Sequence, residues 1–520
     1  MTWSRWRRLR QAVQIGFFAV FVVLLFASLQ KRSVSPVADL FFRLNPLSAV
    51  ASMLASRAWI ERLGLAAVTL AVTLLVGRVW CGWICPMGTV LEWATFARAR
   101  KRAAALSSKL RTAKYVLLIA ILALALLGNL TLVALDPIAI FTRVMTTVVI
   151  PAINYGFNTL EKVLYPVSLL QPAIDGLEGL IRGPVLPVKQ PAFEGTAVIA
   201  GLFVGLLALN LLADRFWCRY LCPLGALLGW LSKVSFLRPV IGQKCNHCSR
   251  CVQVCRPGAV AVEGAVAGSG KAAGATYSVM SSECTVCMDC LAACPQSAVG
   301  FELAWRPAAP RDFDPSRRQV LATLAGAAAG WLVLRSDLRL RVRNPFLIRP
   351  PGAGDESRFL STCLRCSQCM KICPTSALQP SSGEAGLEGT WTPIVIPRVG
   401  YCDYGCNACG QVCPSGAIPS LSLEQKRQAV IGLATVNRNR CLPWASATPC
   451  IVCEEMCPKP DKAIRLEEAT VTNSNGDSLT VQRPYVLRDK CIGCGICENH
   501  CPLEGEAAIR VYTASPVQPL

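Results

Sequence analysis

The sequence contains very few histidines. Only two occur among its 520 residues, His247 and His500, and no C-x-x-C-H segment is present. Haem attached through such a segment is therefore excluded, and a haem held between two histidines in a membrane is not expected. Acidic residues are also scarce, with 32 against 53 basic ones. Charged residues make up only 16% of the chain and apolar residues 53%, a composition typical of membrane proteins.

The excess of basic residues does not indicate a nucleic-acid partner. Many Arg and Lys residues lie in short segments beside apolar stretches, as the positive-inside rule predicts for cytoplasmic loops. We therefore expect no nucleic acid among the partners of this chain.

Five apolar stretches are present, and four of them have the composition of membrane helices. These four run from about 13 to 29, 63 to 80, 115 to 135 and 197 to 213. Basic residues precede the first and follow the second, so we expect both ends of this four-helix unit in the cytoplasm. A further run, Ile138 to Ile153, contains Arg143. We expect an interfacial or re-entrant helix there, with another span as the alternative.

The fifth apolar stretch follows a pair of arginines. Ser316-Arg317-Arg318-Gln319-Val320-Leu321 precedes an Ala/Gly-rich run ending near Leu334, and the pattern resembles a twin-arginine export signal. No convincing A-x-A cleavage site ends the run, so we expect it to remain as an anchor helix. The alternative is a basic linker with a soluble helix, which the four arginines that follow favour: Arg335, Arg339, Arg341 and Arg343.

All 28 cysteines fall into seven groups of four. Four groups have the C-x2-C-x2-C-x3-C spacing by which bacterial ferredoxins bind 4Fe-4S clusters, and two vary it. Disulfide frameworks have no reason to repeat this spacing, and structural zinc normally requires two C-x2-C pairs with a longer gap. We therefore predict six 4Fe-4S clusters. Their predicted ligands are Cys245, Cys248, Cys251 and Cys255; Cys284, Cys287, Cys290 and Cys294; Cys363, Cys366, Cys369 and Cys373; Cys402, Cys406, Cys409 and Cys413; Cys441, Cys450, Cys453 and Cys457; Cys491, Cys494, Cys497 and Cys501.

Paired ferredoxin motifs exchange their fourth cysteines. Cys255 is then expected to join the ligands of the second motif and Cys294 those of the first. Among the last four motifs, the outer two are regular and the inner two irregular, which favours nested exchange, with sequential exchange as the alternative. Arg256 stands where proline usually follows, and its charge could raise the potential of the neighbouring cluster. His247 and His500 are expected near clusters at the surface, without a ligand role.

The remaining cysteines form an internal repeat of two C-x3-C-P elements. The segment from Arg78 to Gly88 matches the segment from Arg215 to Gly225. Two such pairs could converge as a four-thiolate site for a further cluster or another metal. The alternative is a set of buried thiols at helix ends marked by proline. The four residues are Cys81, Cys85, Cys218 and Cys222.

These features predict a multi-domain protein. An α-helical membrane bundle of four transmembrane helices, plus a fifth anchor, is joined to α+β ferredoxin-like 4Fe-4S domains. We expect a membrane domain at 1–235, a two-cluster ferredoxin at 236–306, a linker with the anchor helix at 307–348 and a four-cluster polyferredoxin at 349–520. If the anchor is exported, domain 236–306 is cytoplasmic and domain 349–520 periplasmic.

The repeat core Trp-Cys-x-Trp/Tyr-Ile/Leu-Cys-Pro-x-Gly, followed by a two-cluster ferredoxin, resembles the NapH/MauN family of membrane ferredoxins. The twin-arginine-like start with four cluster motifs resembles the NapG/MauM family. The chain resembles a fusion of the two over nearly its whole length. The resemblance implies a quinol dehydrogenase component of the bacterial inner membrane, which oxidises quinol from the quinone pool. Its electrons would pass to a periplasmic cytochrome or reductase of the nitrate or nitrous oxide type.

The resemblance also leaves a second function open, a maturation or redox-maintenance factor for a periplasmic metalloenzyme. Catalytic residues are not assigned by the sequence. Asp136, Arg143 and Glu161 lie in the outer connection where protons would be released, and they are candidates for the quinol base.

Overall fold

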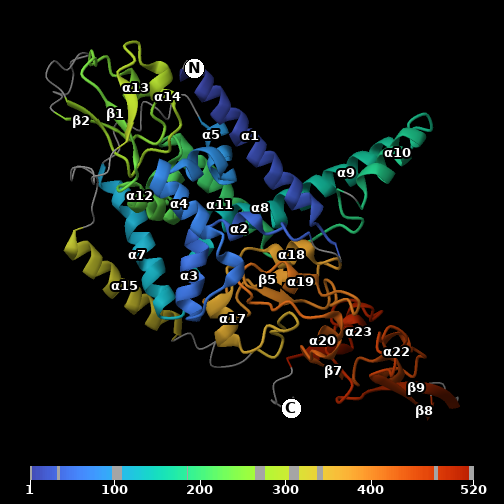
Figure 1. Ribbon diagram of the computed structural model, residues 1–520. Coiled ribbons are helices and arrows are strands. Elements are labelled where there is room, and N and C mark those ends of the chain that lie inside the picture. Colours follow the sequence, from blue (N-terminus) through green and yellow to red (C-terminus); the bar gives the residue numbers. More distant parts are fainter. Residues whose placement is uncertain are drawn as a thin grey trace. The chain divides into compact units, whose positions relative to one another are not determined.

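The computed structural model describes residues 3–31, 35–95, 108–183, 185–263, 276–303, 316–335, 344–472 and 478–513. The chain forms two compact units, each built from separate stretches of sequence (Figure 1). The first comprises Met1–Leu25, Leu40–Val144 and Ala197–Leu332, and the second Phe26–Asp39, Met145–Thr196 and Val333–Leu520. The domain boundaries expected from the sequence remain predictions. Arg339, Arg341 and Arg343, which bear on the anchor, lie outside the described residues.

The first unit is mainly helical and ends in a small ferredoxin. Its helices are α1 (Trp3–Ala27), α2 (Leu40–Arg43), α3 (Pro46–Ser56), α4 (Ala66–Val76), α5 (Pro86–Trp93), α7 (Thr112–Leu126), α8 (Pro137–Val144), α11 (Thr196–Ala208), α12 (Pro223–Ser232), α13 (Arg250–Val254), α14 (Asp289–Ala293) and α15 (Arg317–Arg335). Its strands are β1 (Leu237–Ile241), β2 (Val260–Glu263), β3 (Thr276–Val279) and β4 (Val299–Leu303).

The internal repeat has the same local structure twice. A π-helical turn, η2 (Trp80–Ile84) or η7 (Trp217–Leu221), precedes each second cysteine. Cys85 N–H donates to Trp80 O at 2.9 Å and Cys222 N–H to Trp217 O at 2.8 Å, the spacing of a π turn. Proline then occupies the first position of α5 and of α12, where its missing N–H costs no hydrogen bond.

Two helices in the described ranges are long and apolar enough to cross a membrane, Arg5–Ala27 and Pro137–Leu164. The second contains the run from Ile138 to Ile153 and is 28 residues long, more than the interfacial helix expected there. The other expected spans are shorter than the ~20 residues that a span requires, so a four-helix transmembrane bundle is not confirmed. One reason is that α4 and α7 are followed by glycines at positive φ, Gly77 (85°) and Gly128 (77°).

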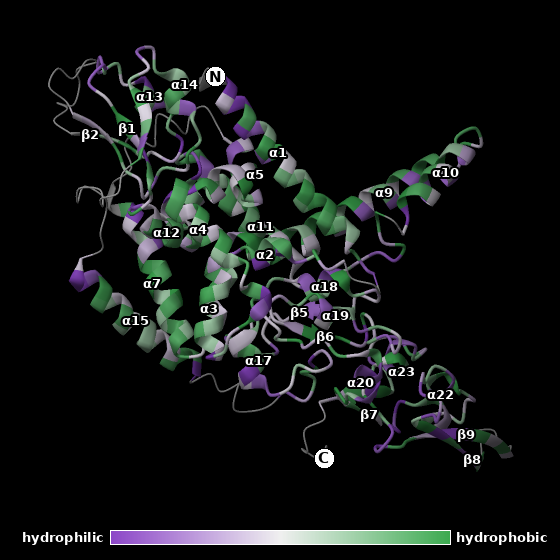
Figure 2. Cartoon of the chain, in the orientation of Figure 1, coloured by the Kyte–Doolittle hydropathy of each residue, from purple (hydrophilic) through white to green (hydrophobic). Residues whose placement is uncertain are grey.

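The expected helix after the twin arginines is present as α15. Figure 2 shows a hydrophilic start followed by green and white residues, whereas α7 is more uniformly apolar. α15 is not among the described helices that are long and apolar enough to cross a membrane, and polar or charged residues stand at both of its ends.

Two antiparallel strand pairs frame the ferredoxin of the first unit. β1 pairs with β4, with Leu237 opposite Leu303, and β2 pairs with β3, with Val260 opposite Val279. Leu291 and Val299 are buried between these elements, together with Cys251. The chain therefore adopts the expected α+β ferredoxin-like arrangement in this segment.

The second unit consists of short elements connected by cysteine-rich loops. Its helices are α9 (Ile150–Leu164), α10 (Gln171–Ile181), α17 (Glu356–Thr362), α18 (Gln368–Ile372), α19 (Ala408–Gln411), α20 (Leu423–Gln428), α21 (Leu442–Ala445), α22 (Val452–Glu455) and α23 (Ile496–Asn499). Its strands are β5 (Leu378–Pro380), β6 (Pro393–Val395), β7 (Leu433–Val436), β8 (Ile464–Thr472), β9 (Ser478–Val486) and β10 (Ile509–Tyr512). They form the antiparallel pairs β5–β6, β7–β10 and β8–β9.

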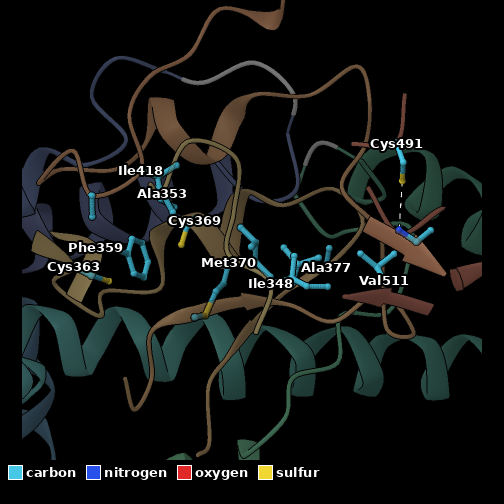
Figure 3. Packing of buried hydrophobic residues seen from close by; sticks show 14 of the residues in the cluster. Ile348, Ala353, Phe359, Cys363, Cys369, Met370, Ala377, Ile418, Cys491 and Val511 are labelled. Carbon is cyan, nitrogen blue, oxygen red and sulfur yellow. Dashed lines mark hydrogen bonds between the residues drawn. The ribbon is translucent and has the colours of Figure 1, made fainter. Parts of the chain in front are cut away.

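One buried cluster runs through the second unit and includes ligands from all four of its motifs. Figure 3 shows Phe359, Met370 and Ile348 packed between Cys363, Cys369 and the segment with Val511. The cysteines are therefore part of the apolar core of this unit.

Candidate metal centres

Left-handed backbone turns surround the second cysteine of each regular motif. The residues immediately before and after it have φ between 53° and 81° in all four motifs. Such angles turn the chain sharply, so that three thiols can face one centre. The residues are His247 and Ser249, Val286 and Met288, Arg365 and Ser367, and Gly493 and Gly495.

The fourth cysteine of most motifs accepts a backbone hydrogen bond at sulfur. The donor–acceptor distances range from 3.1 to 3.4 Å. Such bonds stabilise negative charge on a ligand sulfur and raise the potential of a bound cluster. The pairs are Ala259 N to Cys255, Ala298 N to Cys294, Ile418 N to Cys413, Ala463 N to Cys457 and Ala508 N to Cys501.

Three pockets in the second unit are each lined by four cysteines. In every case three cysteines come from one motif and the fourth from its neighbour. The sets are Cys402, Cys406, Cys409 with Cys373; Cys491, Cys494, Cys497 with Cys457; and Cys441, Cys450, Cys453 with Cys501. Cys413 completes a fourth set, because it is an electrostatic neighbour of Cys363, Cys366 and Cys369.

The expectation of nested exchange is therefore wrong, and the motifs exchange sequentially, first with second and third with fourth. The irregular spacing has a local cause. The extra residue after Cys402 lies in a turn at Asp403, and the long insertion after Cys441 forms α21 and a loop. Both insertions are accommodated without changing which motifs share a core.

The ferredoxin of the first unit shows the exchange expected from its sequence. Cys255 is an electrostatic neighbour of Cys284, Cys287 and Cys290, the first three cysteines of the second motif. Burial raises the pKa of Cys284 to about 11 and that of Cys287 to about 12. Buried thiols of this kind are deprotonated when a metal takes the place of the proton.

The donor sets fit iron–sulfur clusters better than single ions. In the part of the chain that the structure describes, no three or more Cys, His, Asp or Glu side chains are arranged around one ion. The thiols instead surround spaces, as a cluster of several iron and sulfur atoms requires.

The sets of the second unit form a line. Sets that exchange a cysteine are neighbours, and a direct contact joins the two pairs, since Cys402 N–H donates to Cys494 O at 2.8 Å. The order is therefore the set with Cys366, the set with Cys402, the set with Cys494 and the set with Cys450.

The structure brings the four cysteines of the repeat together. Burial raises the pKa of Cys222 well above its ordinary value, and the nearby Cys218, Cys81 and Cys85 raise it further. Cys85 is buried as well, and Cys218 and Cys81 act on it in the same direction. The four thiols are therefore electrostatic neighbours, and a four-thiolate site stays a prediction.

Glu92 is the centre of a buried ion network that sequence patterns offered little reason to expect. Arg10 Nη1 lies 3.0 Å from Glu92 Oε2, and Arg215 and Arg256 also pair with this carboxylate. Burial disfavours the charged carboxylate, but the three arginines outweigh it and lower the pKa of Glu92 to about 2. In the sequence, the signal that could have pointed to this network is Glu92 as a lone acid among basic residues.

A second network surrounds Glu283, next to the ligand Cys284. Lys114 Nζ donates to Glu283 Oε1 at 2.7 Å, and Arg78 Nη1 lies 3.6 Å from Glu283 Oε2. Arg78 also donates to Ser282 O at 2.6 Å. Both networks connect the helical repeat to the ferredoxin within the first unit.

The three candidates for the quinol base each have their own partners. Asp136 is buried, accepts from Asn45 Nδ2 at 2.8 Å and caps α8 through Ile138 N at 2.9 Å. Buried Arg143 donates to Ala134 O at 2.8 Å. Glu161 belongs to the second unit, where it pairs with Arg182 at 3.1 Å.

Three polar residues near the clusters have local partners. Half-buried His247 stacks on Tyr277 with ring centroids 5.5 Å apart, and half-buried His500 places Nδ1 3.1 Å from Ile496 O. Arg256 pairs with Glu92 and lies 3.9 Å from Asp289, and its expected effect on the neighbouring potential stays a prediction.

Family models of 4Fe-4S proteins match most of the cysteine-rich regions, and the group from Cys441 to Cys457 lies outside the matched ranges. A 4Fe-4S binding domain matches residues 58–103 and 195–242, and another matches 484–504. A 4Fe-4S dicluster domain matches 244–298, and a second matches 362–418. Together with the cysteine sets, these matches define an iron–sulfur electron-transfer protein that binds multiple 4Fe-4S clusters.

Relatives come from two groups of ferredoxin-type proteins. The chain is 36% identical over 207 residues to the methylamine utilization ferredoxin-type protein MauM of Methylorubrum extorquens, covering 89% of that protein and 38% of this chain. It is 36% identical over 201 residues to the ferredoxin-type protein NapG of Escherichia coli K12, covering 84% of NapG and 38% of this chain.

A third relative is the methylamine utilization ferredoxin-type protein MauN of Methylorubrum extorquens, 33% identical over 265 residues, 74% of MauN and 49% of this chain. The chain therefore belongs to the MauM/NapG family of ferredoxin-type proteins, fused to a protein of the NapH/MauN type. No solved structure matches it.

Proposed function

We propose that the chain binds at least six 4Fe-4S clusters and oxidises quinol at a membrane, passing the electrons to a periplasmic reductase of the nitrate or nitrous oxide type. The observation that carries the proposal is the presence of two connected series of cysteine sets in a chain that also has helices able to enter a membrane. When bound, the clusters carry single electrons.

The residues of the chain determine where those electrons can move. The contact between Cys402 and Cys494 holds the second and third sets of the polyferredoxin side by side. In the first unit, the exchange of Cys255 and Cys294 brings two sets into one small domain. Shared ligands keep the sets of each series next to one another, which positions them for single-electron transfer.

Oxidation of a quinol releases two protons as well as two electrons, so a proton acceptor is needed near the electron acceptor. Asp136 is the candidate that the structure supports best. Burial raises the pKa of its carboxyl to about 6, despite the hydrogen bonds from Asn45, Ala139 and Ile138 that favour the ionised form. An acceptor with a pKa near the working pH is suited to general-base catalysis.

The experiment is anaerobic mixing of the purified full chain with a menaquinol or ubiquinol analogue. We expect the absorbance of the oxidised clusters to bleach rapidly, to an extent comparable with dithionite reduction. If dithionite reduces the clusters and neither quinol does, the quinol function is wrong.

We further propose location in the bacterial inner membrane, with domain 236–306 in the cytoplasm and domain 349–520 in the periplasm. Reporter fusions after Pro307 and after Leu520, both outside the described residues, test this topology. A cytoplasmic signal from the fusion after Leu520 would contradict export of the polyferredoxin.

A second candidate function is supported by the names of the MauM and MauN relatives, which refer to methylamine utilization. In that case the chain would maintain or help to mature a periplasmic metalloenzyme, without steady quinol turnover. A deletion strain separates the two functions. Loss of the active metal site in the partner enzyme favours maturation, whereas an intact but unreduced enzyme favours electron supply.

A further inference from the structure

The four cysteines of the repeat lie at equivalent positions of two similar structures. Cys81 and Cys218 lie within the π-helical turns, and Cys85 and Cys222 precede the prolines that begin α5 and α12. Close packing holds the site together: a Cβ on Gly88 would lie 2.9 Å from Cys81 O. Cys222 Sγ accepts a hydrogen bond from Gly225 N at 3.2 Å, as the fourth cysteines of the ferredoxin motifs do.

The surroundings of these four thiols are positively charged. Arg78 and Arg215 occupy equivalent positions, three residues before the first cysteine of each element. Their side chains are only 2% and 3% exposed, and both are electrostatic neighbours of Cys81. The networks around Glu92 and Glu283 contain five cations against three carboxylates, the third being Asp289, 3.9 Å from Arg256; the cations are Arg10, Arg215, Arg256, Arg78 and Lys114.

A buried excess of positive charge is costly unless an anion compensates for it. Four neutral thiols supply none, whereas four thiolates around a 4Fe-4S core have a net charge of about two negative units. The cations of the repeat therefore suit a bound cluster better than an unliganded set of thiols.

Both halves of the repeat contact the segments that carry the set of Cys255, Cys284, Cys287 and Cys290. A Cβ on Gly82 would lie 2.3 Å from Thr285 O, and Trp83 Nε1 donates to Val286 O at 2.9 Å. In the second half, Arg219 takes the place of Gly82, and its guanidinium lies close to Gly258, with Cys255 as an electrostatic neighbour.

We propose that Cys81, Cys85, Cys218 and Cys222 bind a further 4Fe-4S cluster, whose charge Arg78 and Arg215 compensate, and that it exchanges single electrons with the cluster at Cys255, Cys284, Cys287 and Cys290. In each exchange one cluster is oxidised while the other is reduced, and no proton or covalent bond is transferred. The four cysteines lie within the segments that the 4Fe-4S binding domain matches. The proposed electron exchange does not depend on which donor reduces the chain.

Iron and sulfide analysis of the anaerobically purified full chain tests the proposal without a variant. We expect about 28 iron atoms per chain and no alkylatable cysteine before denaturation. About 24 iron atoms with four alkylatable thiols, or with two further disulfides, would overturn it. One zinc ion bound in place of the additional iron would overturn it as well.

Variants then identify the ligands. Cys85→Ser and Cys222→Ser should each lose about four iron atoms, and the double variant should lose no more than either one. As the matched control, Cys497→Ser also loses about four, and its combination with Cys222→Ser about eight. Arg78→Gln should retain the iron but lower the midpoint potential of one cluster. An unchanged iron content in both single cysteine variants would contradict the proposal even if the chain remains fully folded.

Discussion

The backbone N–H of Cys402 donates to the carbonyl oxygen of Cys494 at 2.8 Å, which joins the two halves of the polyferredoxin directly. Each half contains two cysteine sets linked by an exchanged ligand. The contact places the set with Cys402 beside the set with Cys494. The four sets are therefore arranged in series, with the sets of Cys366 and Cys450 at the two ends.

Sequential exchange predicts which pairs of cysteine variants act on one cluster. Cys373→Ser combined with Cys402→Ser should lose about four iron atoms, because both cysteines line the same cavity. Cys373→Ser combined with Cys494→Ser should lose about eight. Nested exchange would give the opposite result, so iron analysis of these two double variants decides between the arrangements.

Substitution of Gly495 tests the contact between the two halves of the polyferredoxin. Its φ is 81°, and a Cβ would lie 2.8 Å from Pro397 Cβ, in the segment that leads to Cys402. Gly495→Ala should cost about 1–2 kcal/mol for the backbone conformation and about 1–3 kcal/mol for the clash. Thermal loss of the cluster absorbance should therefore occur at a lower temperature.

Gly505→Ala is the control for the backbone term, since its φ is 72° and no other atom lies within 4 Å of the place that a Cβ would take. Gly505→Ala should therefore lower the stability by the backbone term alone, which is less than the loss expected for Gly495→Ala. Equal shifts in the two variants would show that the contact with Pro397 contributes nothing to stability.

Replacing Glu92 should weaken the docking of the ferredoxin on the repeat. Glu92→Gln leaves three arginines without their shared carboxylate, and removal of one partner from a buried ion pair costs about 3–5 kcal/mol. Thermal unfolding in detergent measures the loss. Glu506→Gln, which removes an exposed pair with Arg510, should cost less than about 1 kcal/mol.

The same network should depend on pH in one direction. The pKa of Glu92 is lowered from about 4.5 to about 2, so its stabilisation is fully present above pH 4.5 and decreases as the pH falls towards 2. The acid-induced loss should be smaller in Glu92→Gln, measured as the change in unfolding temperature between pH 6 and pH 3. An equal loss in both proteins would assign the effect to other carboxylates.

Under the quinol proposal, Asp136 must be ionised to accept a proton. The rate of cluster reduction by quinol should therefore rise as the pH increases through about 6. Asp136→Asn should lower this rate by about 100-fold and remove the inflection, while reduction by dithionite stays the same. Glu161→Gln is the control and should leave the profile unchanged. A retained inflection in Asp136→Asn would identify a different base.

The sequence predicted the features that depend on local spacing. The regular motifs, the exchange of Cys255, the repeated C-x3-C-P structure and the helix after Arg317 all follow from residues close together in the chain. Sequential exchange could not be predicted from the spacing of the motifs. The insertion after Cys441 alters that spacing without altering the packing of the shared core. The pattern of regular and irregular motifs was therefore misleading.

The ion networks between residues far apart in the chain could not be predicted from the sequence either. Glu92 lies 82 residues from Arg10 and 164 from Arg256, and only the fold brings these three side chains together. Helix lengths could not be predicted reliably either, because they depend on tertiary packing. The run from Pro137 continues through a π turn to Leu164, although Arg143 suggested an earlier interruption.

The left-handed residues around the second cysteines make the local conformation of these loops dependent on iron loading. Non-glycine residues such as Val286 and Arg365 hold this conformation at a cost of about 1–2 kcal/mol each, which cluster binding must offset. An empty loop is released from this requirement and should relax. Protease sensitivity at these loops should then distinguish chains without clusters from loaded ones.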